Sequence, residues 1–372
     1  MSWRDEPPFR ADHVGSLLRP PELRRARRDF ADGSLAGDEL RAVENAAILR
    51  GIRLQEDIGL QAATDGELRR GSWHMDFIYQ LGGAEKLASD LAIEFQGASG
   101  PITFTPPAMR VSSRVQLEHT IFGDDFVFLR DNVATAVPKM TIPSPSMVHY
   151  RGGRSAIDET VYPDLDAFWA DLTAAYRDEV VRLGELGCTY LQLDDTSLAY
   201  LNDPAQRAHV AEIGGDPAHQ HEIYIRHLNE AIASRPDGMR ITTHMCRGNF
   251  RSSWFATGGY EYVAEALLNE LQVDGFFMEY DDERSGGFEP LRFLPRGKLV
   301  VLGLVTTKSG ILESKDEIVR RIEQAASFAD IDQLCLSPQC GFSSTVEGNA
   351  LTMEQQAAKL RLVVDVAREV WG

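Results

Sequence analysis

The feature that most constrains this chain is a regular alternation of short apolar runs with longer stretches of helical pattern. Eight runs rich in apolar or β-branched residues are found near 10–16, 60–67, 139–147, 188–195, 239–246, 274–280, 298–307 and 333–340. Helix-like stretches lie between most of them, at 38–57, 164–186, 219–234, 260–271, 314–328 and 353–370. Eight such units with little chain left over predict an α/β fold, a closed (β/α)8 TIM barrel in which residues 1–372 form a single domain.

One segment, from about 68 to 138, interrupts the alternation between strands 2 and 3. It begins with a helix-like stretch and continues with the runs ITFTPP, RVQLEHTIF and DFVFLRD, whose alternation is typical of β-hairpins. We expect a β-rich insertion that lies over the barrel mouth. A lid that excludes water and an elaboration that only stabilises the barrel end would both give this pattern.

Charge and composition argue against several classes of partner. The chain has 38 basic and 56 acidic residues, a net charge of −18, and no long basic run, so neither nucleic acid nor an anionic membrane surface is an expected partner. No window approaches the ~20 apolar residues of a membrane span, and the start MSWRDEPPFR does not resemble a signal peptide. Four cysteines are too few for a disulfide framework, so we expect a cytoplasmic protein. The sequence does not determine the oligomeric state.

Polar side chains end nearly every predicted strand. In barrel enzymes the reactive groups cluster at the carboxyl ends of the strands, where the βα loops converge. A barrel selected for stability alone has no reason to place acids, an imidazole and thiols there. The residues at these ends are Ser16, Glu67, Asp194, Asp195, His244, Cys246, Glu279, Lys308 and Cys340.

Two of these side chains form an H-x-C step that can hold a metal. His244 and Cys246 are two residues apart on a strand end, so their side chains point to the same face. Zinc favours thiolate and imidazole ligands in a tetrahedron, and Cys340 with Glu279 would complete the set. The other two cysteines, at 188 and 335, lie near strand starts, and we expect them to be core thiols.

Six motifs, taken together, resemble a known family. They are HVGS at 13–16, DGE at 65–67, LQLDD at 191–195, HMC at 244–246, FMEY at 277–280 and SPQCG at 337–341. Over nearly its whole length the chain resembles the cobalamin-independent methionine synthases, specifically the short single-barrel relatives of their catalytic C-terminal half. The resemblance implies one catalytic domain and a catalytic zinc bound by His244, Cys246, Glu279 and Cys340.

The resemblance also implies a site for homocysteine. In the family a serine of the first strand and two acids of later strands hold the amino-acid part of that thiol, and the matching residues are Ser16, Glu67 and Asp194. Two carboxylates can pair with the substrate ammonium, and a hydroxyl with backbone N–H groups can bind its carboxylate. The alternative is a charge network that only ties strands together, with Arg69, Arg70 or Arg247 as partners.

The sequence departs from the family where the methyl donor would bind. The family's histidine after the seventh strand, which protonates the folate leaving group, is replaced by Lys308, a candidate general acid or ion-pair partner. The folate-stacking tryptophan after the third strand is absent, because residues 141–146 read TIPSPS. The alkyl donor therefore stays open between methyltetrahydrofolate and another methyl donor, which could be a methyl-carrying protein.

Two other functions fit the same residues. A zinc-dependent alkyltransferase acting on coenzyme M, with an epoxyalkane or methyl-corrinoid donor, would use the metal but would leave the two acids without an ammonium partner. A barrel with a purely structural zinc would have four fixed protein ligands and no open position for a substrate thiol.

Overall fold

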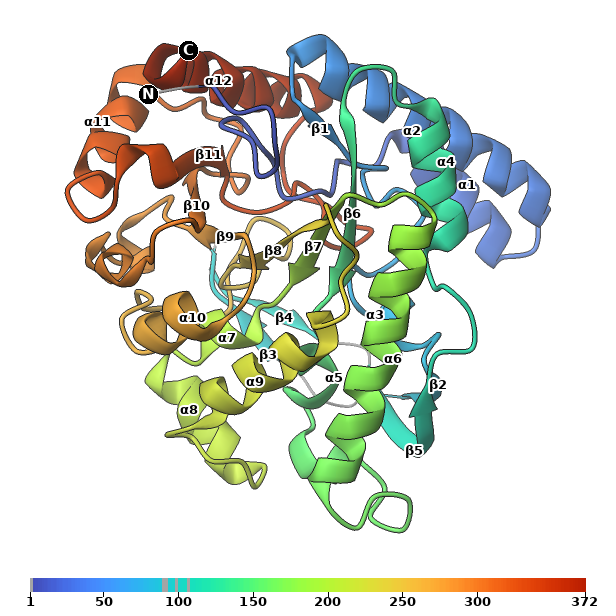
Figure 1. The fold of residues 1–372 in the computed structure, drawn as a ribbon. Coiled ribbons are helices and arrows are strands. Elements are labelled where there is room, and N and C mark those ends of the chain that lie inside the picture. Colours follow the sequence, from blue (N-terminus) through green and yellow to red (C-terminus); the bar gives the residue numbers. More distant parts are fainter. Residues whose placement is uncertain (1–2, 89–92, 98–99, 106–107) are drawn as a thin grey trace.

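A parallel β-sheet lies at the centre of the computed structural model, which describes residues 3–88, 93–97, 100–105 and 108–372 (Figure 1). Seven parallel strands pair in chain order and curl into a TIM-barrel-like sheet. The strands are β1 (Ala62–Ala63), β6 (Val137–Pro143), β7 (Tyr190–Asp194), β8 (Arg240–Met245), β9 (Gly275–Glu279), β10 (Leu299–Val305) and β11 (Leu334–Pro338). Each falls largely within a predicted run. The sequence LVVLGLV of β10 is buried throughout, as expected of a parallel strand covered on both faces.

The first predicted strand, residues 10–16, is not a regular strand. It makes one bridge, from Ala11 to Leu336 of β11, and the N–H of Leu17 donates to the Gly66 carbonyl beyond β1 at 3.0 Å. The Asp12 carboxylate accepts hydrogen bonds from backbone N–H groups of its own segment, at 2.8 Å and 3.2 Å. Such local bonds compete with a sheet ladder. The segment therefore lies between β11 and the end of β1 with little strand pairing of its own.

Helices surround the sheet (Figure 1). They are α1 (Pro21–Ala31), α2 (Gly37–Ile58), α3 (Met75–Ile78), α4 (Gly123–Asn132), α5 (Ser146–His149), α6 (Leu165–Glu185), α7 (Ser197–Tyr200), α8 (Pro204–Glu212), α9 (Gln220–Ile232), α10 (Ala264–Glu270), α11 (Lys315–Ala325) and α12 (Met353–Trp371). Local sequence sets several ends. The Asp164 side chain caps α6, Thr352 and Gln355 form a capping box on α12, and α2 ends at Gly59 with φ of 92°. No helix in the described part of the chain is long and apolar enough to cross a membrane.

The insertion between β1 and β6 is partly as predicted. It contains two antiparallel pairs, β2 (Gly82–Leu87) with β5 (Ala108–Gln116) and β3 (Ile93–Phe95) with β4 (Ile102–Phe104). The end of the run ITFTPP, residues 106–107, lies outside the described residues.

The strand prediction for DFVFLRD is wrong, because these residues belong to helix α4. Phe126 and Leu129 are buried there at a spacing of three, which a helix places on one face. Its N-terminal turn also carries two acids, Asp124 and Asp125, which suit a helix start. A short run with apolar residues at both spacings does not distinguish the two structures.

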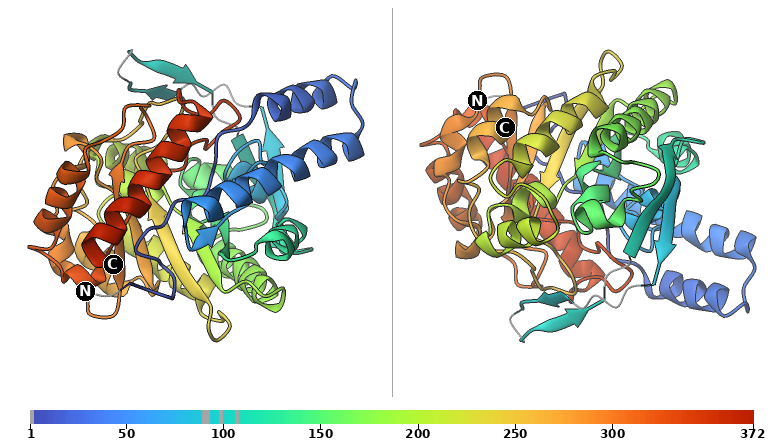
Figure 2. Two further views of the ribbon diagram at one scale, coloured as in Figure 1. Left: turned by 90° about the horizontal axis from the view of Figure 1, so that it is seen from above. Right: turned by 90° about the horizontal axis from the view of Figure 1, so that it is seen from below.

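The β3–β4 hairpin lies at one end of the molecule (Figure 2). Backbone hydrogen bonds of 2.7 Å in both directions join Gln96, next to β3, to Trp254 in the loop after β8. The insertion is therefore tied to the loop that follows the H-x-C step.

Candidate functional site

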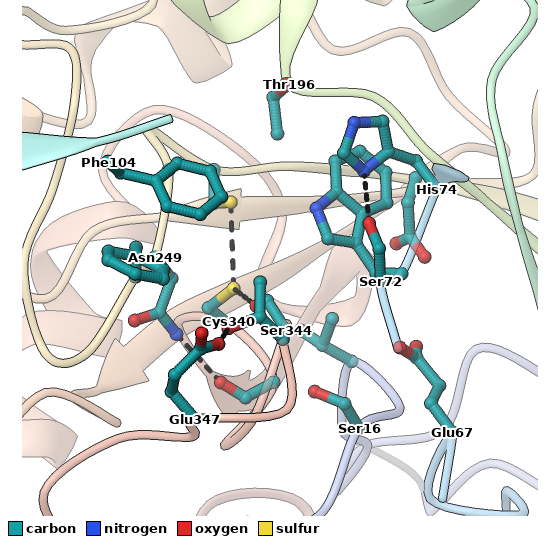
Figure 3. A pocket seen from close by; sticks show the side chains of 18 of the residues that line it. Ser16, Glu67, Ser72, His74, Phe104, Thr196, Asn249, Cys340, Ser344 and Glu347 are labelled. Carbon is teal, nitrogen blue, oxygen red and sulfur yellow. Dashed lines mark hydrogen bonds between the residues drawn. The ribbon is translucent and has the colours of Figure 1, made fainter. Parts of the chain in front are cut away.

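A cavity of about 240 Å³ opens where the carboxyl ends of the strands meet (Figure 3). Six of the eight predicted site residues line it, although they come from five different segments of the chain. The six are Ser16, Glu67, Asp194, His244, Cys246 and Cys340. Glu279 and Lys308 are not among the lining residues.

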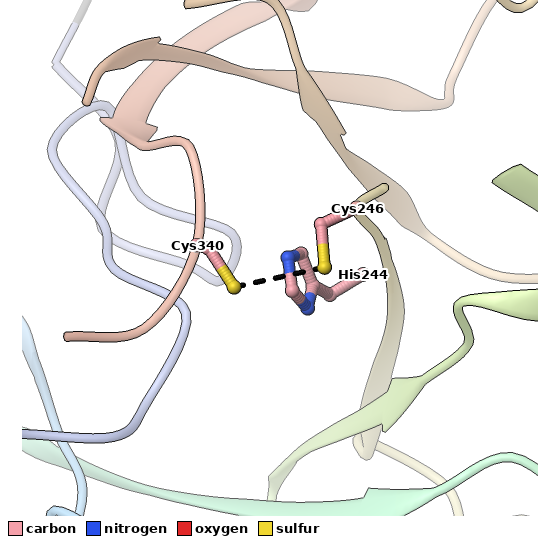
Figure 4. A group of neighbouring side chains, drawn as sticks. All are labelled: His244, Cys246 and Cys340. Atoms are coloured by element: carbon pink, nitrogen blue, oxygen red, sulfur yellow. Dashed lines mark hydrogen bonds between the residues drawn. The ribbon is translucent and has the colours of Figure 1, made fainter. Parts of the chain in front are cut away.

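Three of these side chains form a buried group that can hold a metal ion (Figure 4). One ligand atom from each of His244, Cys246 and Cys340 lies within 4.8 Å of the other two. The two sulfurs are 3.6 Å apart, too far for a disulfide bond of about 2.05 Å. The H-x-C step of β8 supplies two ligands to one face, and the end of β11 brings the third across the cavity.

The imidazole of His244 is held in a suitable orientation for metal binding. Its Nδ1 lies 3.1 Å from Oδ1 of Asp194, whereas its Nε2 is buried without a hydrogen-bond partner. A carboxylate on one ring nitrogen commonly fixes a metal-binding histidine and leaves the other nitrogen for the ion. Asp194 is itself fixed by Nε2 of Gln192 at 2.7 Å.

The electrostatics of the group favour a thiolate. The hydrogen bond from Cys246 lowers the pKa of Cys340 well below its usual value against the effect of burial, and His244 lowers it further. Zinc prefers donor sets of this kind, with two buried sulfurs, one of them readily ionised, and an imidazole nitrogen without another partner. The three residues therefore fit a zinc ion.

Glu279 is close to this group but is held by other partners. Its Oε2 accepts from the backbone N–H of Arg247 at 2.7 Å, and its Oε1 lies 2.6 Å from Arg284 and 3.4 Å from Lys308. Burial opposes ionisation, but the charges of Lys308, Arg284 and Arg247 lower the pKa of Glu279 strongly. Among the described residues, the group of close ligand atoms does not include this carboxylate. Its role as the fourth zinc ligand stays a prediction.

Lys308 occupies an ion pair. Its Nζ lies 2.5 Å from Asp281, an acid with a buried side chain that sequence reasoning did not single out. Burial lowers its pKa, but the carboxylates of Glu279 and Asp281 outweigh that effect and raise it. A general acid needs a lowered pKa in a lysine, so these contacts favour the ion-pair alternative, and the catalytic role stays a prediction.

The predicted substrate residues line the cavity beside the thiols (Figure 3). The hydroxyl of Ser16 accepts from the backbone N–H of Ser343 at 3.2 Å. Glu67 has φ of 54° and accepts from the Thr141 hydroxyl at 3.1 Å, whereas its Oε2 is buried without a partner. Nη1 of Arg70 is 3.9 Å from Oε1 of Glu67. The predicted charge network with Arg70 is therefore present but weak.

Burial raises the pKa of Glu67 to about 7. The guanidinium of Arg70 opposes this shift, and the charge of Asp194 adds to it. A carboxylate in such surroundings is stabilised when a cation, such as a substrate ammonium, binds beside it.

The remaining cysteines are core thiols, as expected. Cys188 and Cys335 are buried away from the cavity, and Cys335 packs with Val14, Phe277 and Val301.

Sequence reasoning missed an aromatic wall and a cation. Phe95 and Phe104 of the insertion line the cavity together with Trp73, His74 and Arg151. The alternating pattern of the insertion indicated strands, but it did not reveal which side chains would face the cavity.

Comparisons with known proteins agree with this geometry. The family described as "Cobalamin-independent synthase, Catalytic domain" matches residues 132–369. The uncharacterized protein YxjH of Bacillus subtilis is 46% identical over 98% of this chain and 95% of its own. Methionine synthase of Pyrococcus abyssi is 23% identical over 88% of this chain and 84% of its own.

A solved structure from Listeria monocytogenes is also similar. It is provisionally assigned as a vitamin-B12-independent methionine synthase, and it superposes with a TM-score of 0.79 at 36% identity. The alignment covers 99% of this chain and 100% of that one, so the fold is shared from end to end.

Proposed function

Because the chain belongs to the family of cobalamin-independent methionine synthase catalytic domains, we propose that it is a zinc-dependent methyltransferase that converts homocysteine to methionine. One observation carries the proposal. The metal-binding group of His244, Cys246 and Cys340 opens onto the same cavity as Ser16, Glu67 and Asp194. Thiol chemistry and amino-acid recognition are thus combined in one cavity.

We assign different roles to the substrate-binding and the zinc-binding residues. Glu67 and Asp194 pair with the substrate ammonium, and the Ser16 hydroxyl receives the substrate carboxylate. Zinc, held by His244, Cys246 and Cys340 with Glu279 as the fourth ligand, would favour the thiolate form of a substrate sulfur at neutral pH. The sulfur–methyl bond forms as the bond from the methyl carbon to its donor breaks.

The donor is methyltetrahydrofolate or another carrier of a methyl group. Lys308 is proposed to act on the donor's leaving group only through the charge that it contributes beside Glu279. The protein is proposed to work in the cytoplasm as a single catalytic domain, a closed (β/α)8 barrel. The bridge from Ala11 to Leu336 supports this closure, because it places residues 10–16 where an eighth strand would lie.

Zinc content and thiol binding test the proposal together. Cys340→Ser should lose most of the zinc that purified wild-type protein retains, and homocysteine binding by calorimetry should fall with it. Cys188→Ser is the matched control, because this core thiol donates to the backbone carbonyl of Tyr190 and does not line the cavity. It should keep the zinc.

The zinc absorption edge, recorded with and without homocysteine, supplies the second measurement. A gain of one sulfur neighbour on adding homocysteine is expected. An unchanged edge would contradict the proposal, and a gain with coenzyme M alone would favour the coenzyme M alkyltransferase.

A further inference from the structure

An exposed pair of apolar residues lies in the loop between β10 and α11. Ile311 is 79% exposed and Leu312 is 50% exposed, and among the large apolar side chains of the described residues none has a larger exposed fraction than Ile311. Scattered apolar side chains are common on protein surfaces, whereas contiguous ones mark interaction sites. We refer to Ile311 and Leu312 as the apolar knob.

The loop that carries the knob is held in place by α12. Nζ of Lys359, a lysine whose side chain is fully buried, donates to the Ile311 carbonyl at 2.6 Å and lies 2.9 Å from Oε2 of Glu313. Oε1 of Glu313 also accepts from the backbone N–H of Thr306 at 2.8 Å. The main chain on both sides of Leu312 is therefore fixed, and an ordered loop loses little conformational entropy when a partner binds.

An apolar groove of about 380 Å³ lies between α12 and α2. Leu54 of α2 and Met353 of α12 line it and are half-buried. The buried apolar residues that line it include Leu17, Leu18 and Leu68. Because α12 lies between α11 and α2 (Figure 1), the knob and the groove are on different sides of α12.

The exposed face of α12 separates the knob from the groove. Ala357 lines the groove and Lys359 holds the knob, and at about 100° per residue their side chains point about 160° apart around the helix. Asp365, which is exposed, lies between them on the outer face. A two-fold axis parallel to α12 would therefore set the knob of each copy over the groove of the other. Such an interface is closed, because one pair of copies uses both surfaces.

The charges beside the two surfaces are opposite. Arg361 lines the groove and is exposed, and within the described part of the chain its guanidinium forms no ion pair or hydrogen bond. Asp316, in the first turn of α11 just after the knob, is exposed as well. A knob that enters the groove of a second copy would bring this acid toward Arg361, and such complementarity favours one register of two surfaces.

We propose that two copies of this chain form a symmetric dimer in which the knob of each copy enters the groove of the other. One chain carries both complementary surfaces, so the partner that fits them is a second copy. The groove shares no lining residue with the thiol cavity, so the dimer does not depend on the proposed function.

Sedimentation of the full chain over a concentration series tests the dimer. The wild-type protein should form dimers, and Ile311→Asp should raise their dissociation constant about hundredfold, because it places a charge in two apolar contacts. Phe30→Ser is the matched control, because Phe30 is 48% exposed on α1 and lines no part of the groove. It should leave the dissociation constant unchanged. Both changed side chains are exposed, so far-ultraviolet circular dichroism should match that of the wild type.

A charge reversal tests the reciprocal contact. Arg361→Glu and Asp316→Lys should each weaken the dimer about tenfold, and the double variant should recover most of the wild-type affinity, because each contact pairs one residue from either copy. Failure of this rescue would refute the reciprocal contact. A wild-type protein that stays monomeric at every concentration, a dimer that Ile311→Asp leaves intact, or a series of ever larger assemblies would each overturn the symmetric dimer.

Discussion

Replacement of Glu67 by glutamine separates a substrate-binding carboxylate from a structural one. In the structure the pKa of Glu67 rises from an ordinary value of 4.5 to about 7, chiefly because the group is buried. Each pKa unit corresponds to about 1.4 kcal/mol, so ionising this carboxyl group costs about 3 kcal/mol of folding stability.

Proton binding to Glu67 determines how the stability of the protein changes with pH. Between pH 4.5 and about 7 the folded protein holds a proton on Glu67 that the unfolded chain has lost, so wild-type stability falls as the pH rises through this window. Glu67→Gln has no carboxyl group to ionise at this position, so its stability does not fall in this way. Relative to wild type, its free energy of unfolding should therefore be higher by about 3 kcal/mol at pH 8 than at pH 5.

Homocysteine binding should favour the wild-type protein, whereas stability at high pH should favour Glu67→Gln. An ammonium beside Glu67 offsets the cost of its charge, so the variant should bind homocysteine about ten- to hundredfold more weakly while keeping its zinc. Glu179→Gln is the matched control. Burial also raises the pKa of Glu179 to about 7, but its carboxylate accepts from the N–H of Ile121 and does not line the cavity.

The assay combines urea unfolding at pH 5 and pH 8 with calorimetric titration of homocysteine. If Glu67→Gln lost the same stability at both pH values and bound homocysteine normally, the carboxylate would be a structural partner of Arg70. The reasoning from burial and from substrate recognition would then both be refuted.

Further predictions address the rest of the site. In Gly341→Ala the new Cβ would collide with the Ser16 hydroxyl. Homocysteine binding should therefore weaken about tenfold at unchanged zinc content. Normal affinity for homocysteine would exclude Ser16 from substrate recognition. In Lys308→Met the buried Asp281 carboxylate keeps, among the described residues, only a distant ion pair with Arg284 at 3.6 Å. Urea unfolding should report a loss of about 2 kcal/mol, and an unchanged midpoint would contradict the ion pair. Removal of zinc by a chelator should lower the melting temperature and leave the far-ultraviolet circular dichroism unchanged, because sheet pairing holds β8 and β11 independently; unfolding on chelation would mean that the metal is structural.

The sequence predicted most of what depends on local pattern. The parallel strands and the main helices follow from apolar periodicity, and the H-x-C step places two ligands on one face because strand side chains alternate. The motif set also identified the family. DFVFLRD was misread because apolar residues in a short run fit both a helix and a strand. Residues 10–16 pair little because the Asp12 carboxylate accepts from the backbone N–H groups of Phe9 and His13.

Contacts between distant parts of the chain were decided by the tertiary structure. The sequence named Cys246 and Cys340 as partners, but their approach to 3.6 Å depends on how β8 and β11 are placed around the sheet. The ion pair of Lys308 with Asp281 joins loops after two different strands. Phe95 and Phe104 of the β3–β4 hairpin line the same cavity as Arg151, although these residues are far apart in the sequence. Local patterns are fixed by neighbours in the chain, whereas the partner of a charge and the wall of a cavity are set by packing between segments that the sequence separates.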